Sequence, residues 1–207
     1  MSINSCQQVV SQPINVDYDL ERDIILQFMN KLKDAGYVGY ITGGHAFKQW
    51  VDEKEKTSDW DIHIYLTTKQ MKNPKNYENI YNLIKELYIE YKNQITNLDR
   101  LVKFDYAKWS SKYIGCLFRN KMTEYYNSNV ICDIQFENEL DTFVDISISC
   151  SFDMKEIENK IDNHYISIDC LEKDLSKYLE DLKNGNEERE KILKVKSRLE
   201  RVKKIIN

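Results

Sequence analysis

Apolar residues recur at helical spacing in four parts of the chain, which predicts four long helices. These segments run from Asp19 to Ala35, from Pro74 through Tyr91, across Leu171 to Leu182, and over about residues 187–206. Gly36 follows the first of them directly, where a glycine C-cap is expected. A shorter helix is predicted at about 46–51, with Phe47 and Trp50 on its inner side.

Other segments alternate between apolar and polar residues or are rich in β-branched and aromatic residues, which predicts strands. The first two are expected at about 37–42 and 59–66. Residues 98–150 contain three or four more, two of them a hairpin around Glu137–Asp141. We therefore expect an α/β (α+β) fold, in which helices flank a mixed β-sheet and a C-terminal helical pair packs against it.

The domain organisation expected from these patterns has three parts. Residues 1–16 lack periodicity and are interpreted as a flexible N-terminal arm. The core is expected over 17–165 and a C-terminal helical region over 166–207. No internal repeat or low-complexity linker separates them.

Composition narrows the class of protein. The chain has 207 residues, of which 42% are apolar and 31% charged, as is typical of globular proteins. No apolar run reaches the ~18 residues of a membrane span, and the polar N-terminus is no signal peptide. We therefore expect a cytoplasmic protein in a reducing compartment, without a membrane partner. The odd number of cysteines, five, and the lack of a C-x-x-C pair suggest neither disulfides nor zinc.

Two adjacent glycines, Gly43 and Gly44, indicate a special backbone position, because the chain has only six glycines in all. They stand between a predicted strand and a predicted helix. Backbone N–H groups at such a turn form an anion site. The sequence therefore predicts phosphate binding here.

Two carboxylates, Asp59 and Asp61, share one face of the next predicted strand, whose other face is wholly apolar. Residues i and i+2 lie about 7 Å apart along a strand, so both can reach one cation or two neighbouring cations. Mg²⁺ prefers such oxygen ligands and completes its shell with water and substrate phosphate. Asp145 is favoured as a third carboxylate, and Asp133 is the alternative.

The order Gly-Gly, helix, loop, Asp-x-Asp on a strand and a later Asp resembles the DNA polymerase β-type nucleotidyltransferase superfamily. Within it, GGHAFKQW followed by SDWDIHIYL is most similar to the poly(A) polymerase catalytic subunits of large DNA viruses. The motif-bearing resemblance covers about residues 37–66 together with Asp145. His45, inside the glycine turn, and a chain much shorter than full poly(A) polymerases depart from the pattern.

This resemblance implies a nucleotidyltransferase-type fold and a function. Gly43 and Gly44 would hold the triphosphate of ATP or another nucleoside triphosphate, while Asp59, Asp61 and Asp145 would bind Mg²⁺ or Mn²⁺ in a two-metal site. The expected reaction transfers a nucleoside monophosphate to an acceptor hydroxyl, as in polyadenylation of an mRNA 3′ end. RNA and a protein partner subunit that supplies RNA binding are the partners it suggests.

Two alternatives to this enzyme remain open. The chain could be a catalytically inactive scaffold or binding subunit on the same fold, which the net charge of −4 favours. It could also be a transferase that acts on a small molecule or a protein. The joint presence of the glycine pair and three carboxylates favours the enzyme. The basic residues of the closing helix are mixed with glutamates, so we interpret that helix as a solvated amphipathic one.

Overall fold

A computed structural model describes residues 18–57, 59–95, 102–104, 130–136, 142–151, 153–185 and 189–207. The predicted arm at 1–16 lies outside these ranges, as does one of the segments expected as strands within 98–150, KYIGCLFRN at residues 112–120. Seven helices and seven strands are found in the described part of the chain. The fold is mixed α/β, as predicted.

The strands form one mixed sheet in the order β3-β4-β5-β2-β1-β7-β6. In chain order they are β1 (Val38–Thr42), β2 (Trp60–Thr67), β3 (Val102–Phe104), β4 (Val130–Phe136), β5 (Thr142–Ser151), β6 (Ile161–Asp162) and β7 (Tyr165–Ile166). Strand β2 runs antiparallel to β1 and parallel to β5. The predicted hairpin is confirmed, because β4 and β5 pair antiparallel across the 137–141 connection.

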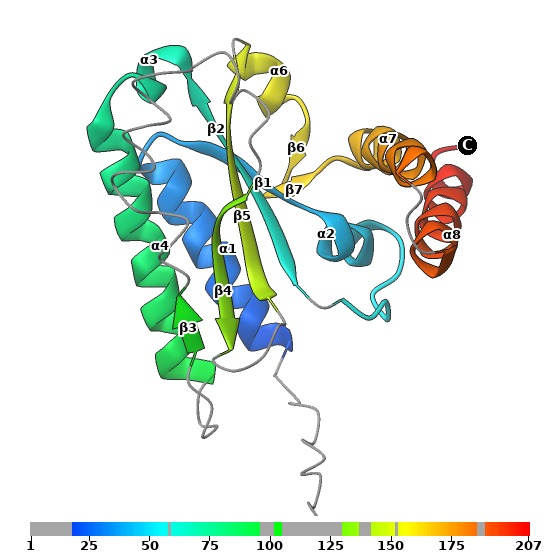
Figure 1. The fold of residues 1–207 in the computed structure, drawn as a ribbon, viewed down its shortest axis with the longest axis horizontal. Coiled ribbons are helices and arrows are strands. Elements are labelled where there is room, and N and C mark those ends of the chain that lie inside the picture. The colour runs from blue at the N-terminus through cyan, green and yellow to red at the C-terminus, as the bar shows by residue number, and fades with distance from the viewer. Residues whose placement is uncertain are drawn as a thin grey trace, which may run out of the picture.

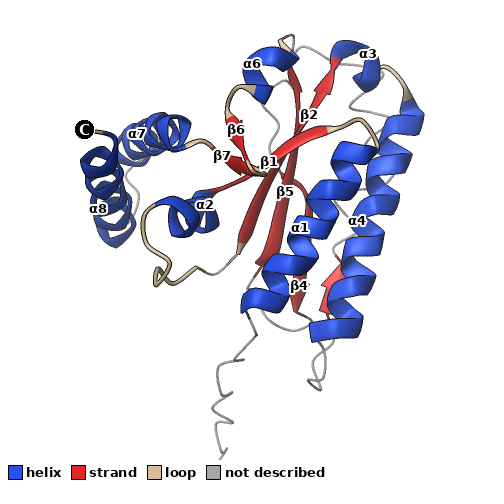
Figure 2. Cartoon of the chain, turned by 180° about the vertical axis from the view of Figure 1, so that it is seen from behind, coloured by secondary structure: helices blue, strands red, loops and turns tan. Residues whose placement is uncertain are grey.

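Two long helices cover one face of this sheet, α1 (Tyr18–Asp34) and α4 (Pro74–Ile95), and they lie side by side (Figures 1 and 2). The predicted alternation of β2 explains this face: Trp60, Ile62, Ile64 and Leu66 are buried while the residues between them are half-buried. Val144, Ile146 and Ile148 of β5 are cross-strand neighbours of three of these side chains and complete the apolar layer.

The remaining helices are α2 (Gly43–Trp50), α3 (Thr68–Met71), α6 (Met154–Glu158), α7 (Ile168–Asn184) and α8 (Arg189–Ile206). Helices α7 and α8 pack together as the predicted C-terminal pair and stand beyond α2 in Figure 1. The buried leucines of α7 and the buried Val195, Leu199 and Val202 of α8 form the apolar faces of this pair. The indole N–H of Trp50 donates to the Ile166 carbonyl at 2.7 Å, which ties α2 to β7.

The ends of the helices follow local backbone chemistry. Gly36 closes α1 with φ +80°, and the Tyr37 N–H donates to the Leu32 carbonyl at 2.9 Å, as in a Schellman motif. Helix α2 begins at Gly43, three residues earlier than predicted, so the glycine pair is its first turn. The short elements α3, α6 and the β6–β7 hairpin were not predicted.

Candidate functional site

The predicted glycine turn is the junction of β1 and α2. Gly43 adopts φ +61°, a conformation that favours glycine. Thr42 is the N-cap residue of α2, yet its side chain makes no capping hydrogen bond. The N-terminus of a helix carries partial positive charge and outward N–H groups. This turn therefore has the backbone chemistry of an anion site.

Asp61 lies directly against this turn. It is the cross-strand neighbour of Thr42 in the β1–β2 register. A Cβ atom added to Gly43 would overlap the Asp61 carboxylate. The glycine turn and the Asp-x-Asp strand thus meet at one point, as the sequence predicted.

The register also relates the other two candidate aspartates to Asp61. Asp145 on β5 stands directly opposite Asp61 across the parallel β2–β5 pair. Asp133 on β4 stands opposite Asp145, so it is one strand further from Asp61. Neighbouring strands lie about 4.8 Å apart, which places the backbone of Asp145 closest to the Asp-x-Asp strand. The side chains of Asp145 and Asp133 are outside the described set.

The described carboxylates of the site are those of Asp59 and Asp61, both half-buried. Among the side chains that the structure describes, no group of three or more His, Cys, Asp or Glu residues is arranged to hold a metal ion. Protein sites for Mg²⁺ typically supply one or two carboxylates and leave the other positions to water and phosphate. Two oxygen-donor side chains beside an anion-binding turn fit such an ion when it is bound together with phosphate.

A cavity of about 510 Å³ opens over these residues. Its core side is formed by Thr42, the glycine pair, Thr57, Asp59, Asp61 and His63, and the C-terminal helical pair forms the rest. Ligand pockets commonly have volumes of about 300–1,000 Å³. The predicted site residues therefore line a space large enough for a nucleotide.

Helix α8 contributes a basic wall to this cavity. Lys191, Lys194 and Arg198 all line it, and their spacing places them on one side of the helix. Sequence periodicity had suggested only a solvated amphipathic helix. The basic wall and the glycine turn together give the cavity a chemistry that suits phosphate.

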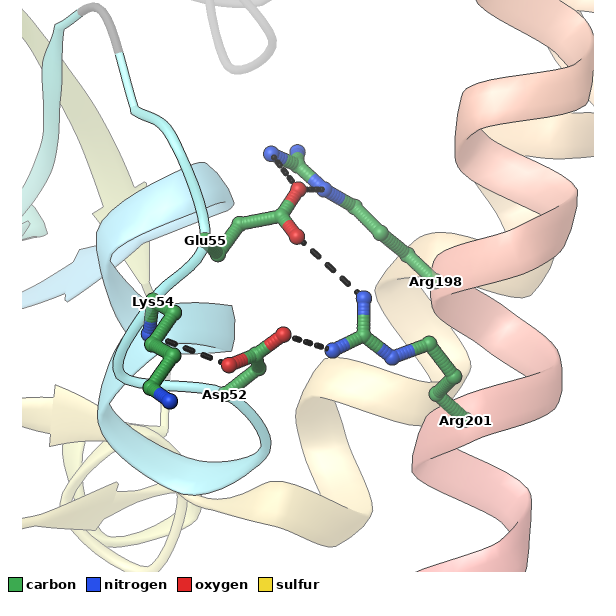
Figure 3. Close-up of polar contacts among 5 residues, drawn as sticks. All are labelled: Asp52, Lys54, Glu55, Arg198 and Arg201. Carbon is green, nitrogen blue, oxygen red and sulfur yellow. Dashed lines mark hydrogen bonds and ion pairs between the residues drawn. The ribbon is translucent and has the colours of Figure 1, made fainter.

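Arg198 and Arg201 are held by two acidic residues of the loop that follows α2 (Figure 3). Arg198 donates from Nε and Nη2 to Oε1 of Glu55, at 3.0 and 2.9 Å. Arg201 reaches Oε2 of the same glutamate at 3.2 Å and also pairs with Asp52. Both guanidinium groups lie over the Phe47 ring, at 5.4 and 4.8 Å from its centre. These contacts fix α8 against the α2 side of the cavity.

The two histidines near the motif have different positions. His45 is buried and stacks on Trp60 with 3.5 Å between ring centres, so its side chain belongs to the core. Burial, with help from nearby positive charges, lowers the pKa of His45 to about 3. His63 lines the cavity beside Asp61, and burial lowers its pKa as well. Both imidazoles are neutral at pH 7.

Comparisons of the chain with protein-family models, with curated proteins and with solved structures found no match. In the part of the chain that the structure describes, none of the helices has the length and apolar character needed to span a bilayer. A function for the protein is therefore inferred from the chemistry of the cavity.

Proposed function

We propose that the protein is a metal-dependent nucleotidyltransferase. It moves a nucleoside monophosphate from a nucleoside triphosphate to an acceptor hydroxyl, and the preferred acceptor is the 3′ end of an RNA. The observation that carries the proposal is that the glycine turn, Asp59, Asp61 and the basic side chains of α8 line one cavity. The preference for RNA and for ATP follows from the poly(A) polymerase-like pattern of residues 37–66.

The triphosphate would occupy the charged part of the cavity. The backbone at Gly43 and Gly44 offers N–H groups at the start of α2, and Lys191, Lys194 and Arg198 supply positive charge. Electrostatic stabilisation of a transferring phosphoryl group is usually the largest catalytic effect, because positioned donors need no reorganisation. The clamp from Glu55 holds Arg198 in place before the nucleotide arrives.

Asp59 and Asp61 would hold Mg²⁺ or Mn²⁺, with Asp145 as the third carboxylate because of its register position opposite Asp61. When bound, these ions neutralise phosphate charge and activate the attacking oxygen. The acceptor hydroxyl attacks the α-phosphorus, and the bond to pyrophosphate breaks with its electron pair. We assign to Asp145 the removal of the proton from the hydroxyl. The α8 cations stabilise the charge on the departing pyrophosphate.

The proposal is tested by incubating the purified protein with Mg²⁺ or Mn²⁺, a short single-stranded RNA and each labelled nucleoside triphosphate in turn. We expect extension of the RNA, most with ATP. Asp61→Asn should abolish extension while leaving the circular dichroism spectrum unchanged. Asp162→Asn is the matched control, because this exposed aspartate lies on β6 outside the cavity.

Each other result has a definite meaning. Extension that persists in Asp61→Asn would show that the site is not the one assigned. Nucleotide binding without extension would indicate that the acceptor is a small molecule or a protein, or that the reaction requires a partner subunit. No nucleotide binding with either ion would favour an inactive scaffold, and the proposed function would fail.

A further inference from the structure

The wall that α7 gives to the cavity differs in chemistry from the other walls. Leu171, Asp174, Leu175 and Tyr178 line it, at a spacing that places them along one side of the helix. Tyr178 keeps 42% of its surface exposed, and among the described residues it is the aromatic side chain that stands with the exposed large apolar ones. This wall is apolar and aromatic with a single carboxyl group.

A nucleoside triphosphate has the same division into a charged part and a flat apolar part. The glycine turn, the Asp-x-Asp strand and α8 suit the triphosphate, whereas Leu171, Leu175 and Tyr178 of α7 offer a surface on which a base can pack. The ammonium group of Lys191 lies 5.8 Å from the centre of the Tyr178 ring, so the charged and apolar parts of the cavity meet at this tyrosine. Bases stack favourably on aromatic side chains whatever their sequence, because every base has a flat π-face. If the triphosphate lies at Gly43, the base lies along α7.

We propose that Asp174 selects the nucleobase, by accepting a hydrogen bond from an exocyclic amine of a base that packs beside Tyr178. The inference rests on the proposed function, because it takes the occupant of the cavity to be a nucleotide. An ionised carboxylate only accepts hydrogen bonds, so it favours an exocyclic amine, which adenine, cytosine and guanine carry. It repels the carbonyl oxygen that hypoxanthine and uracil carry at the same position.

The surroundings of Asp174 leave its oxygens available for a base. Within the described residues its carboxyl makes no hydrogen bond or ion pair, and Lys160 and Lys177 act on it only through their more distant charges. Asp174 is exposed and lines the cavity, and the protein around it removes part of its water, which raises the pKa of this carboxyl. Asp181, on the same helix, is exposed and does not line the cavity.

The test uses two pairs of nucleotides, ATP with ITP and CTP with UTP. In each pair an exocyclic amine is replaced by a carbonyl oxygen, and the neighbouring ring nitrogen gains a proton. Dissociation constants are measured with Mg²⁺ for the wild-type chain, for Asp174→Asn and for the matched control Asp181→Asn. The wild type should bind the amine-bearing member of at least one pair about tenfold more tightly, as expected for a hydrogen bond to a charged group. Asparagine both donates and accepts, so Asp174→Asn should reduce this preference to about twofold. Asp181→Asn should keep it.

Three results would overturn the inference while leaving the nucleotidyltransferase intact. The wild type could bind nucleotides without preference in either pair, or Asp174→Asn could keep the wild-type preference. Asp174→Asn could also lose turnover with its binding preference unchanged, which would place this carboxyl in the chemical step. If the wild type binds none of these four nucleotides and no GTP, the proposed function fails first and the inference fails with it.

Discussion

A Cβ atom built on Gly43 would lie 1.9 Å from Oδ2 of Asp61, so glycine is the residue that leaves room for this carboxylate. The backbone of Gly43 independently requires glycine, because its φ is +61°. The first requirement concerns the functional site, and the second concerns the backbone conformation of the turn. Alanine substitutions of Gly43 and of Gly36 separate the two effects.

Gly43→Ala should therefore lose stability and function together. The left-handed conformation costs about 1–2 kcal/mol for a residue with a Cβ, and the new methyl group displaces Asp61. A displacement of about 1 Å at a reacting centre costs about 100-fold in rate, so kcat/KM for nucleotide transfer should fall at least that far. Urea unfolding and the transfer assay measure the two effects.

Gly36→Ala is the control for this prediction. Gly36 has φ +80°, and an added Cβ would meet no atom within 4 Å. This variant should lose a similar amount of stability and keep its activity. Equal activity of the two variants would show that Asp61 does not need its present position.

Local patterns predicted the elements that carry the site. Helix α1 and strand β2 were predicted to within a residue or two, because each buries one side only and therefore shows a clean period. The β6–β7 hairpin was missed because its strands have two residues each, too few for a period. Its turn, with positive φ at Asn163 and His164, lacks the glycine that usually marks such a turn.

The side of the site formed by the sheet and the glycine turn could be predicted from spacing along the chain. The side formed by α7 and α8 could not. Gly43, Asp59 and Asp61 are close in sequence, so one turn and one strand were enough to bring them together. Arg198 reaches Glu55 across 143 residues. Local periodicity cannot predict this contact, since it depends on how α7 and α8 pack against the rest of the protein. The role of His45 could not be predicted for a related reason, because its burial depends on its stack with Trp60.

The ion pairs between the α2 loop and α8 should contribute to stability beyond the usual surface pair. Side-chain exposure is 13% for Arg198 and 17% for Glu55, so removal of the glutamate charge deprives a largely buried Arg198 of this partner. Arg201 is more exposed and keeps its pair with Asp52. Loss of one partner costs about 3–5 kcal/mol for a fully buried pair. We expect about 1–3 kcal/mol for Glu55→Gln after allowing for the remaining solvent.

Urea unfolding of Glu55→Gln and Glu200→Gln measures this effect against a matched control. Glu200 also lies on α8 and pairs with Lys196 at 3.9 Å, but both side chains are about 60% exposed. Glu200→Gln should change the free energy of unfolding by less than about 0.5 kcal/mol. A loss of the same size in both variants would mean that the Glu55 cluster is no stronger than a surface pair.

Glu21 of α1 should make the protein less stable as the pH rises towards neutrality. Burial raises its pKa from 4.5 to about 7, although the hydrogen bond from the Tyr91 hydroxyl lowers the pKa in part. The folded chain holds this proton more tightly than the unfolded chain. The resulting contribution to the free energy of unfolding is therefore complete below pH 4.5 and is lost as the pH rises to about 7. The loss should be about 2–3 kcal/mol.

Chemical denaturation between pH 4.5 and 8 tests this assignment when the wild type is compared with Glu21→Gln. The glutamine stays neutral and can still accept from Tyr91. The free energy of unfolding of the variant should therefore fall less across this range, and the two curves should diverge above pH 5. Parallel curves would show that Glu21 titrates at its ordinary value.

His45 should act in the opposite direction at lower pH. Its pKa falls from 6.5 to about 3 on folding, mainly because the ring is buried. The unfolded chain therefore binds the proton first, and stability is lost as the pH falls from 6.5 towards 3. His45→Phe keeps an aromatic ring against Trp60 but cannot titrate. Between pH 6.5 and pH 4 the wild type should lose about 2–3 kcal/mol more than this variant.

The opposing slope from Glu21 overlaps this range, so the His45 comparison is best made in the Glu21→Gln background. In that background, the free energy of unfolding should decline steeply as the pH falls when position 45 is histidine. It should change less with pH when position 45 is phenylalanine. His63 also has a lowered pKa and is present in both chains, so it cancels in the difference. An equal acid slope with and without His45 would mean that the imidazole takes up its proton in the folded protein, which a ring enclosed against Trp60 should not do.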